Sequence, residues 1–579
     1  MPVYNSDVVD IFNQVADLLE IEGANPYRVR AYRDAARTIS TLSRNLSDMV
    51  EAGEDLTELP GIGEDLAGKI EEIVRTGDLE QLEQLEQHTP PELARMLDVA
   101  GLGPKRVQTI HEELGVTTLR ELKEAAEQGK IHELHGLGEK TETKILEDLE
   151  RWTEKEAQRT RRDVAEERVE PLLVFLRGIE TVGRVEAAGS YRRKKETVGD
   201  LDILAISDVG EEVISRFGDY EDVEQIVSQG ETRSTVVFRS GLQVDLRVVQ
   251  QKSYGAALLY FTGSKQHNIT LRNMALDREL KINEYGVWDT TAAPEGQKMV
   301  AGETEEEIYA LFDLPWIPPE LREDRGEVEA AQQNRLPELV TLDDIRGDLQ
   351  LHTTASDGRA TLEEMARAAR ALGREYLAVS DHSGYIGVTQ GLDADALAER
   401  VEEIARLDEE MDDIILLKSI EVDMMEDGSL DLPDEALEKL DIVTCAVHSH
   451  FDLPADKQTE RIIRAMDNPN CNILAHPTAR QIGKRPPCEL DMGRVMDAAL
   501  ERGCFLELNA QPDRLDLDDV YCKMARERGL KISISTDAHS TEELSFMRFG
   551  VYQARRGWLE PEDVLNTRSW DDLKELIRR

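Results

Sequence analysis

The 579-residue sequence is poor in basic residues and in aromatic residues. It holds 69 Lys and Arg against 118 Asp and Glu, so its formal net charge is −49, and aromatic residues make up 5%. One interpretation is a protein that avoids polyanions, because a basic surface is the usual signature of nucleic-acid binding. The other is a protein of a very salty cytoplasm, where an acidic, well-hydrated surface keeps proteins soluble. The excess of Arg over Lys and the scarcity of aromatics favour this second, halophilic interpretation.

The sequence also lacks paired cysteines, long apolar runs and a basic-then-apolar start. Its cysteines are Cys445, Cys471, Cys488, Cys504 and Cys522. No two form a CxxC pair, which indicates reduced, partly buried thiols rather than a zinc ribbon or a disulfide framework. No apolar run approaches the ~20 residues that span a bilayer. We therefore expect a cytoplasmic protein with no membrane partner, and its length predicts roughly three to five domains.

One glycine pattern recurs in the first 150 residues, as LPGIG at 59–63, VAGLG at 99–103 and LHGLG at 134–138. Each copy precedes a helix-like segment, and glycine lets free backbone N–H groups approach a phosphate. Ordinary helix turns are the alternative, but three copies favour helix-hairpin-helix motifs that grip the DNA backbone without reading sequence. Backbone amides need no lysine-rich surface for this. The predicted DNA-binding residues are Gly61, Gly63, Gly101, Gly103, Gly136 and Gly138.

Lys69 lies on the helix expected after the first hairpin. It could neutralise a nearby phosphate, or act as a Schiff-base nucleophile toward an abasic sugar if its pKa were lowered. Electrostatic neutralisation is the default interpretation.

Three carboxylates fall on two strand-like segments, GDLDIL and LQVDLRVV. Period-two spacing places Asp200 and Asp202 on one strand face, and Asp245 follows on the second strand. Such a set can hold two Mg²⁺ ions for phosphoryl transfer, with Asp245 as the candidate to help remove a proton from the attacking hydroxyl. Upstream, Gly189 and Ser190 form a small polar turn. Acidic solvent-facing strands remain the alternative for an isolated DxD pair.

The set GSYRR, GDLDIL, VDLRVV, YFTGS and KINEYG resembles the family X DNA polymerases over residues 1 to about 325. The resemblance implies that Asp200, Asp202 and Asp245 bind metal, and that Ser190, Arg193 and Gly199, beside Gly189, cradle the triphosphate. It further implies a sugar pocket of Tyr260, Phe261 and Gly263, and base-pair contacts from Asn268 and Arg272. Lys69 matches the family's Schiff-base lysine, whereas Asp65 reverses a basic charge of that pocket. The partners implied are gapped or primer-template DNA and dNTPs.

The C-terminal region alternates strand-like with helical runs, after a proline- and charge-rich segment at 314–339 that predicts an extended linker. This rhythm predicts a parallel β/α barrel, whose chemistry lies at the carboxyl ends of its strands. Six of the eleven histidines follow or end those runs: His352, His382, His448, His450, His476 and His539.

The motifs LHTTASDG, SDHS, IEVD, VHSHF, LAHP and STDAHS resemble the PHP (polymerase and histidinol phosphatase) domain. The resemblance implies that Glu421 bridges two metals, one also bound by His352 and Asp537 and the other by His448 and His476. It assigns Asp357, His382 and His539 to a third ion. Mn²⁺ or Zn²⁺ suits this mixed set. Gln350 stands where members with an active nuclease carry histidine, which predicts a weakened first metal site.

The expected fold is multidomain, α/β and α+β, with helical helix-hairpin-helix domains, a nucleotidyltransferase palm and a PHP-type β/α barrel. The boundaries are 1–85 (lyase-like), 86–158 (fingers-like), 159–255 (palm), 256–325 (thumb-like), 326–345 (linker) and 346–579 (PHP). We expect a monomeric, nucleoid-associated polymerase that fills short gaps in base excision repair, with a 3′–5′ exonuclease or 3′-phosphatase, from a halophilic archaeon. Two alternatives are a polymerase with an inactive PHP module and a non-catalytic DNA-end-binding scaffold.

Overall fold

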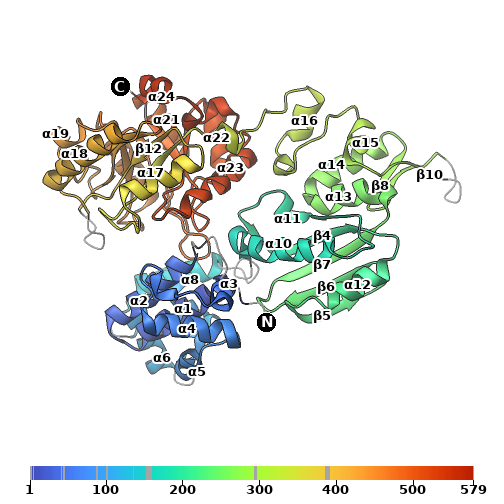
Figure 1. The fold of residues 1–579 in the computed structure, drawn as a ribbon, viewed down its shortest axis with the longest axis horizontal. Helices are drawn as coiled ribbons and strands as arrows, with labels where there is room; N and C mark the ends of the chain where they lie inside the picture. The colour runs from blue at the N-terminus through green and yellow to red at the C-terminus, as the bar shows by residue number, and fades with distance from the viewer. Residues whose placement is uncertain are drawn as a thin grey trace.

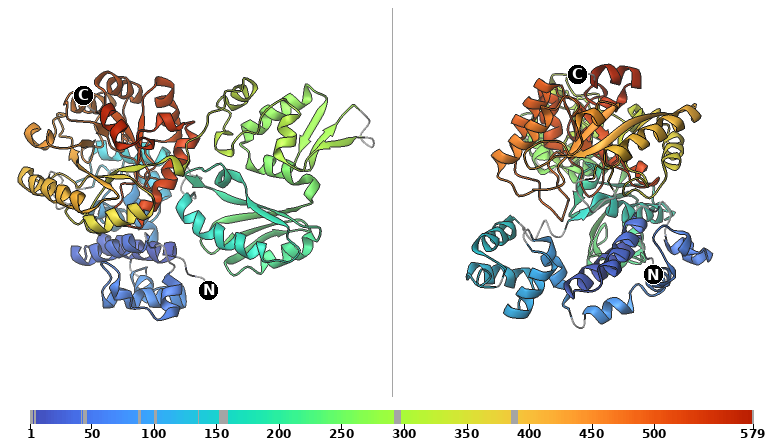
Figure 2. Two further views of the ribbon diagram at one scale, coloured as in Figure 1. Left: turned by 45° about the horizontal axis from the view of Figure 1, so that its top comes forward. Right: turned by 90° about the vertical axis from the view of Figure 1, so that its left-hand side faces the viewer.

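A computed structural model describes the chain except for residues 1–2, 4, 41, 43–45, 87–88, 100–101, 135, 152–158, 292–296, 385–390 and 578–579. Three bodies are visible in Figure 1: an N-terminal group of helices, a C-terminal barrel above it, and a mixed α/β region to the side. Two further views in Figure 2 show the same separation. Among the described residues, no helix combines the length and apolar composition needed to cross a bilayer.

The N-terminal body contains two helical groups with separate cores. The first comprises α1 (Asn5–Ile21), α2 (Pro26–Ser40), α3 (Leu46–Ala52), η1 (Leu56–Glu58), α4 (Glu64–Thr76) and α5 (Glu80–Glu86). The second comprises η2 (Pro91–Asp98), α6 (Pro104–Leu114), α7 (Leu119–Glu127) and α8 (Glu139–Arg151).

The described residues of the three glycine patterns share one backbone hydrogen bond. In each, the apolar residue between the glycines donates its backbone N–H to the carbonyl three residues earlier, at 3.0–3.1 Å, and is buried; these residues are Ile62, Leu102 and Leu137. Gly61 and Gly136 have φ of +75° and +83°, a conformation that favours glycine. Gly63 and Gly103 are N-caps without side-chain bonds. The first-turn N–H groups of α4 therefore stay available, whereas α6 begins with Pro104, which has no N–H, and its Arg106 N–H donates to the Gly103 carbonyl at 2.8 Å. Gly138 immediately precedes α8, and Gly101 lies outside the described residues.

The palm is a five-stranded mixed sheet of order β2-β4-β7-β6-β5. Its elements are β1 (Thr160–Arg161), α10 (Arg162–Arg177), β2 (Arg184–Ala187), α11 (Gly189–Arg192), β3 (Thr197–Val198), β4 (Asp200–Ile206), α12 (Gly210–Gly218), β5 (Val223–Gln229), β6 (Arg233–Phe238) and β7 (Gln243–Val249). Buried residues alternate along β4, β6 and β7, and pack beneath α10 and α12. The opposite face of β4 and β7 is therefore left for the carboxylates.

The region after the palm packs two helices against a three-stranded antiparallel sheet. It comprises η3 (Gln251–Ser253), α13 (Tyr254–Thr262), α14 (Lys265–Leu276), β8 (Leu280–Asn283), β9 (Gly286–Asp289), β10 (Lys298–Ala301) and α15 (Glu305–Ala310).

The segment expected to be an extended linker is instead folded. It contains η5 (Pro319–Leu321), α16 (Glu327–Gln332) and η6 (Leu342–Asp344). Two of its charged residues are fully buried, Arg322 against Glu305 and Glu327 beside His267, while others such as Glu329 and Arg335 are exposed. The extended-linker prediction was wrong because the two buried charges find buried partners that are distant in sequence.

The C-terminal barrel has seven parallel strands in chain order. They are β11 (Gly347–Leu351), β12 (Tyr376–Val379), β13 (Ile415–Asp423), β14 (Ile442–Ala446), β15 (Ile473–Leu474), β16 (Phe505–Asn509) and β17 (Ile532–Ser535). A parallel bridge between Leu351 and Ala538 joins the last strand to the first, so the ring is nearly closed.

Helices surround this ring (Figure 1). They are α17 (Leu362–Ala371), α18 (Ala394–Glu410), α19 (Asp434–Leu437), α20 (Ala455–Met466), α21 (Met492–Arg502), α22 (Asp519–Arg528), α23 (Met547–Arg556) and α24 (Trp570–Ile577), with η7 (Glu543–Phe546), η8 (Pro561–Asp563) and η9 (Leu565–Thr567). On α24, Trp570 and Leu573 pack with Tyr376 and Ile442, the first residues of β12 and β14. Because α24 covers the amino-terminal end, the barrel is accessible at the carboxyl ends of its strands.

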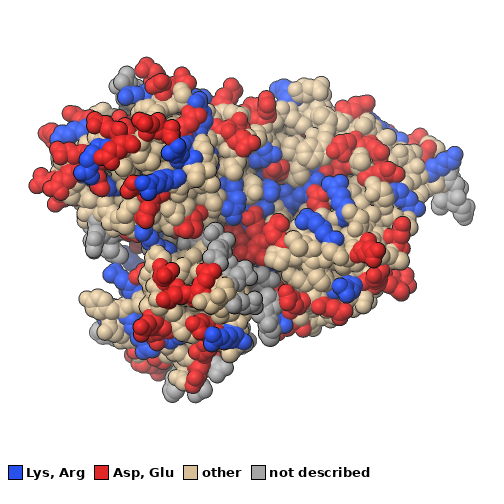
Figure 3. All heavy atoms as spheres, viewed as in Figure 1, with Lys and Arg blue, Asp and Glu red and all other residues tan. Residues whose placement is uncertain are grey.

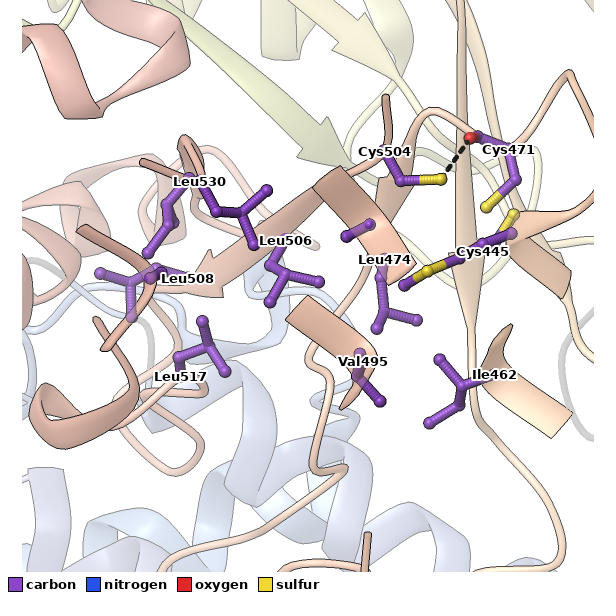
Figure 4. Close-up of a cluster of buried hydrophobic side chains, with 14 of the residues drawn as sticks. Cys445, Ile462, Cys471, Leu474, Val495, Cys504, Leu506, Leu508, Leu517 and Leu530 are labelled. Atoms are coloured by element: carbon purple, nitrogen blue, oxygen red, sulfur yellow. Dashed lines mark hydrogen bonds between the residues drawn. The ribbon is translucent and has the colours of Figure 1, made fainter. Parts of the chain in front are cut away.

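All five cysteines are free and buried, as the sequence predicts for reduced thiols. Figure 4 shows Cys445, Cys471 and Cys504 packed among leucines between the strands and the helices, with Cys504 Sγ donating to the Cys471 carbonyl at 3.2 Å. They act here as small apolar side chains.

Candidate active sites

The first candidate site lies where β4 runs parallel to β7. The pairing places Asp202 directly opposite Asp245, with Asp200 two residues away on the same face of β4. Asp245 is held in place because Thr235 Oγ1 and Gln243 Nε2 each donate to one of its carboxylate oxygens, at 2.5 and 2.8 Å. The three predicted carboxylates therefore converge.

The negative charges of these three carboxylates repel one another. The pKa of Asp202 is raised to about 7, chiefly by burial and further by the negative charges of Asp200 and Asp245. Burial and Asp245 also raise the pKa of Asp200. A divalent cation would relieve this repulsion, so the three carboxylates fit the expected metal.

A cavity of about 550 Å³ opens beside Asp200 and Asp202. It is lined by every residue predicted to bind nucleotide: Gly189, Ser190, Arg193, Gly199, Tyr260, Phe261, Gly263, Asn268 and Arg272. Gly189 must be glycine here, because a Cβ would lie 2.4 Å from Asp202 Oδ2 and its φ is +59°. Asn268 Nδ2 donates to the Tyr260 carbonyl at 2.8 Å, which orders the side expected to receive the sugar and base.

Three basic residues of this cavity escaped the sequence reasoning: Arg159, Lys195 and Lys265. Arg159 donates to Thr197 Oγ1 at 2.8 Å, 38 residues away, and its guanidinium lies against Gly199. Lys195 could have been recognised as part of the RRKK run, but no local pattern signals Arg159.

Lys69 lies apart from both cavities, on α4. Its ammonium forms an ion pair with Asp65 one helical turn away and lies 5.6 Å from the centre of the Tyr32 ring.

The second candidate site lies at the carboxyl ends of the barrel strands, and Glu421 of β13 is at its centre. Its carboxylate oxygens lie within 3.5 Å of ring nitrogens from four histidines that follow β11, β12, β14 and β15: His352, His382, His448 and His476. Asp537 Oδ1 is 2.9 Å from His352 Nε2. Asp357 Oδ2 is 3.4 Å from His539 Nε2 and 3.6 Å from His382 Nε2. All eight predicted residues thus meet at one place.

These side chains form overlapping groups that could hold metal ions. The groups are His352, Asp357, His382 and His539; His382, Glu421 and His448; and His352, Glu421 and Asp537. His352 is fully buried, yet neither ring nitrogen makes a hydrogen bond within the described residues. Its Nε2 is nevertheless close to two carboxylates. A buried imidazole that converges with carboxylate oxygens is a donor set that fits a divalent cation.

Neighbouring charged groups shift the pKa values of the histidines in this site. Burial opposes the charge on His539, but Asp357, Asp537 and Glu543 raise its pKa to about 9. Burial likewise opposes the charge on His382, and Glu421 and Asp357 raise its pKa well above the ordinary value. By contrast, burial and Arg514 lower the pKa of His476 to about 4. Protons on two histidines thus supply the positive charge that metal ions would bring, and metal binding would displace them.

The backbone is strained at two of these positions. His476 has φ of +25° and Asp537 has φ of +52°, a region that residues with a side chain rarely adopt. Such strain persists where the surrounding fold holds a residue in a functional geometry.

Several supporting residues were missed from the sequence. Asp423 Oδ1 lies 2.7 Å from His448 Nδ1, and Asn509 Nδ2 donates to Asp537 Oδ2 at 2.9 Å. Asp423 could have been found, because it follows Glu421 by two residues and so shares its strand face. Lys484, Arg485 and Arg514 line the site's cavity of about 650 Å³, together with Arg33 of α2. No sequence periodicity predicts that these residues, from loops and from another domain, line the cavity.

Gln350 is buried inside the barrel, 1% exposed. Neither its Oε1 nor its Nε2 has a hydrogen-bond partner within the described residues. An unpaired buried amide costs about 1–3 kcal/mol.

Family models match three parts of the chain: a helix-hairpin-helix domain at residues 3–79, a SAM-like helix-hairpin-helix tandem at 93–151, and the DNA polymerase beta thumb at 257–323. The DNA polymerase/3′-5′ exonuclease PolX of Bacillus subtilis is 37% identical over 586 residues, covering 100% of both chains. A probable phosphatase of Thermoanaerobacter sp. is 31% identical over 38% of this chain and 90% of its own length. DNA polymerase lambda of Arabidopsis thaliana is 25% identical, over 55% of this chain and 62% of its own.

Full-length similarity of this degree settles the class. The chain belongs to the family X DNA polymerases that carry a C-terminal exonuclease region. Its N-terminal and thumb regions are those of a DNA-binding nucleotidyltransferase, and the family depends on divalent metal ions. The predicted origin in a halophilic archaeon finds no support in these relatives.

Proposed function

We propose that the chain fills short gaps in damaged DNA by nucleotidyl transfer. The observation that carries this is the carboxylate group Asp200, Asp202 and Asp245, beside a cavity lined by the predicted nucleotide contacts. Two Mg²⁺ ions, when bound by these carboxylates, would stabilise the attacking and leaving oxygens. Asp245, held by Thr235 and Gln243, would orient the primer hydroxyl and help remove its proton.

Other residues of the cavity position the substrates. Ser190, Arg193 and Gly199 would hold the triphosphate, Tyr260, Phe261 and Gly263 would enclose the sugar, and Asn268 and Arg272 would contact the nascent base pair. The hairpin glycines would present backbone N–H groups to template phosphates. Lys69, paired with Asp65, would neutralise phosphate charge rather than form a Schiff base.

Primer extension on gapped DNA tests the polymerase proposal. Asp200→Ala should lower nucleotide incorporation by about 10³-fold or more, because one carboxylate of the metal group is removed. Asp219→Ala, an exposed carboxylate at the end of α12 in the same palm, is the control and should change little. Undiminished incorporation by the Asp200 variant contradicts the assignment.

For the barrel we propose metal-dependent hydrolysis of phosphodiesters at DNA 3′ ends. Up to three Mn²⁺ or Zn²⁺ ions, bound by the His and carboxylate groups around Glu421, would activate water and stabilise the leaving oxygen. The inactive-module alternative is disfavoured, because a structural barrel gains nothing from burying a histidine with unpaired ring nitrogens among carboxylates.

His382→Ala separates the two activities. It should abolish 3′ degradation of single-stranded DNA while leaving incorporation intact, since His382 belongs to two of the three candidate groups. His450→Ala is the matched control, because His450 lies two residues after His448 and belongs to none of those groups. Loss of both activities, or of neither, counts against independent sites.

The proposal also covers the oligomeric state, the location and the domain boundaries of the chain. We infer that the chain acts as a monomer beside the chromosome, and divides at about residues 85, 158, 255, 325 and 345. The separate apolar clusters of the N-terminal groups, the palm and the barrel support the boundaries near 85, 158 and 255, whereas residues 328–339 share an apolar cluster with residues 256–321.

A further inference from the structure

Helix α23 of the barrel contacts the nucleotide-binding loop of the palm through Arg556. This side chain is 2% exposed, and its guanidinium makes three contacts outside its own helix. Nη1 donates to the carbonyl of Arg193 at 2.7 Å and to Glu323 Oε1 at 3.0 Å, and Nη2 donates to Asp519 Oδ2 at 2.6 Å. A residue of the C-terminal domain thus holds both the backbone and the acidic partner of Arg193.

Glu323 fixes the side chain of Arg193 at the edge of the polymerase cavity. Arg193 Nε donates to Glu323 Oε1 at 3.0 Å, and its Nη1 donates to the carbonyl of Thr262 at 2.5 Å. Within the described residues its Nη2 has no protein partner, and Arg193 lines the 550 Å³ cavity. The guanidinium is therefore held on two nitrogens and free on the third.

The charges along this chain of contacts alternate. Arg193, Glu323, Arg556, Asp519 and Arg325 are joined in that order, by ion pairs of 2.6–3.0 Å. Burial would raise the pKa of Glu323, but Arg193, Arg556 and Lys195 lower it to about 2, so the carboxylate is ionised. Without Arg556, the ion pairs of Glu323 in the described part of the chain would reduce to Arg193. Glu323 would then compete with the nucleotide phosphates for the charge of Arg193.

We propose that Arg556 is a positioning residue for nucleotidyl transfer. By binding Glu323 and the Arg193 carbonyl, it shares the negative charge of Glu323 and leaves Arg193 able to bind the polyphosphate of an incoming nucleotide. The C-terminal barrel therefore completes the nucleotide site of the polymerase, whatever its own hydrolytic activity. This inference rests on the proposed polymerase function.

Arg555 provides a matched control on the same helix and interface. Its Nε donates to Glu320 Oε1 at 2.8 Å, and its Nη1 donates to the Val340 carbonyl at 3.1 Å. It also joins the barrel to the segment after the thumb, but neither of these two contacts links it to Arg193. Loss of domain attachment alone would make the Arg555 and Arg556 variants alike.

The test measures KM for dNTP and kcat on gapped DNA, with the full-length protein. Arg556→Gln should raise KM about 10-fold with a smaller change in kcat, because a charge-assisted contact to phosphate is weakened. Arg555→Gln should stay within about two-fold of wild type, and Arg556→Lys should recover part of the lost affinity. Glu323→Gln should lower KM, since its amide oxygen can still accept from Arg193 Nε while the competing charge is gone. Degradation of single-stranded DNA should be the same in all four variants.

A double variant identifies the residue through which Arg556 acts. In an Arg193→Ala background, Arg556→Gln should add no further rise in KM. An additional rise there, or equal KM values for the Arg555 and Arg556 variants, overturns the proposal. If Arg556→Gln does not fold, Arg556→Lys and Glu323→Gln carry the test, and a rise in KM for the Glu323 variant also overturns it. Absence of incorporation by wild type would instead refute the polymerase function itself.

Discussion

Gln350 lies on β11, two residues before His352. Because every second residue of a strand faces the same side, both side chains point into the barrel. The Gln350 amide is buried and has no partner among the described residues, while His352 above it meets Glu421 and Asp537. The glutamine at position 350, where histidine is expected, therefore lies beside one candidate metal group, and the residues of the other groups are unchanged. We interpret it as a rewired site with a weaker first metal.

Gln350→His should raise nuclease activity and lower the Mn²⁺ concentration needed for half-maximal rate, by about 10-fold. An imidazole at this position would add a nitrogen ligand to the group of His352, Glu421 and Asp537. The measurement is degradation of single-stranded DNA over a Mn²⁺ titration.

Gln350→Leu is the control for packing. It removes the unpaired amide and should stabilise the protein by about 1 kcal/mol or more in thermal unfolding, without any gain in hydrolysis. Equal nuclease rates for Gln350→His and wild type would show that position 350 does not face the metals.

At the scale of elements, the glycines of the first hairpin have two different roles. Gly61 has φ of +75°, so a side chain there strains the turn. Gly63 has φ of −88°, and no described atom lies within 4 Å of the position that a Cβ would take, so alanine fits there. Gly61 therefore serves the fold of the turn, and Gly63 leaves the N–H groups of α4 accessible.

We expect Gly61→Ala to lower the stability of the N-terminal helices by about 1–2 kcal/mol. Gly63→Ala should cost less than about 1 kcal/mol, yet weaken binding to gapped DNA, because its methyl group stands where phosphate approaches. Thermal unfolding and DNA titration at fixed salt distinguish the two. DNA affinity unaffected by Gly63→Ala would argue against phosphate binding by this hairpin.

Much of this arrangement could be predicted from the sequence, and the rest depended on distant contacts. Period-two spacing was sufficient to predict Asp200 and Asp202 on one strand face, and the βα rhythm predicted the barrel. The buried partners of Glu327 and Arg193 could not be predicted, because ion pairs 60 and 130 residues apart leave no local pattern. The same holds for Arg33, which reaches the barrel cavity from another domain.

At the scale of the whole molecule, charge is unevenly distributed. On the face shown in Figure 3, Asp and Glu side chains are numerous around the edge, and several Lys and Arg side chains gather near the centre, where the barrel meets the palm, beside a patch of acidic side chains. Two ion pairs join the barrel to the rest of the chain, Arg480–Glu196 and Arg556–Glu323. The net charge of −49 thus opposes DNA approach at low salt.

Activity should persist at molar KCl and rise from low salt toward it. Salt shortens the range over which the acidic surface repels DNA, while buried ion pairs and backbone–phosphate contacts are screened less. Gap filling measured from about 0.05 to 2 M KCl checks this. An optimum below ~0.2 M would refute adaptation to high salt.

The strand order of the barrel has a consequence for synthesis on the ribosome. Each strand pairs with the next one made, but His352 near the start of the barrel must meet Asp537 and His539 near its end. The metal cluster can therefore assemble only after almost the whole chain has been translated. Arg556 emerges later still, so a chain that stops before Asp537 would be both a nuclease without its last ligands and a polymerase with an unsupported Arg193. An incomplete product would therefore lack hydrolysis and would bind nucleotide more weakly.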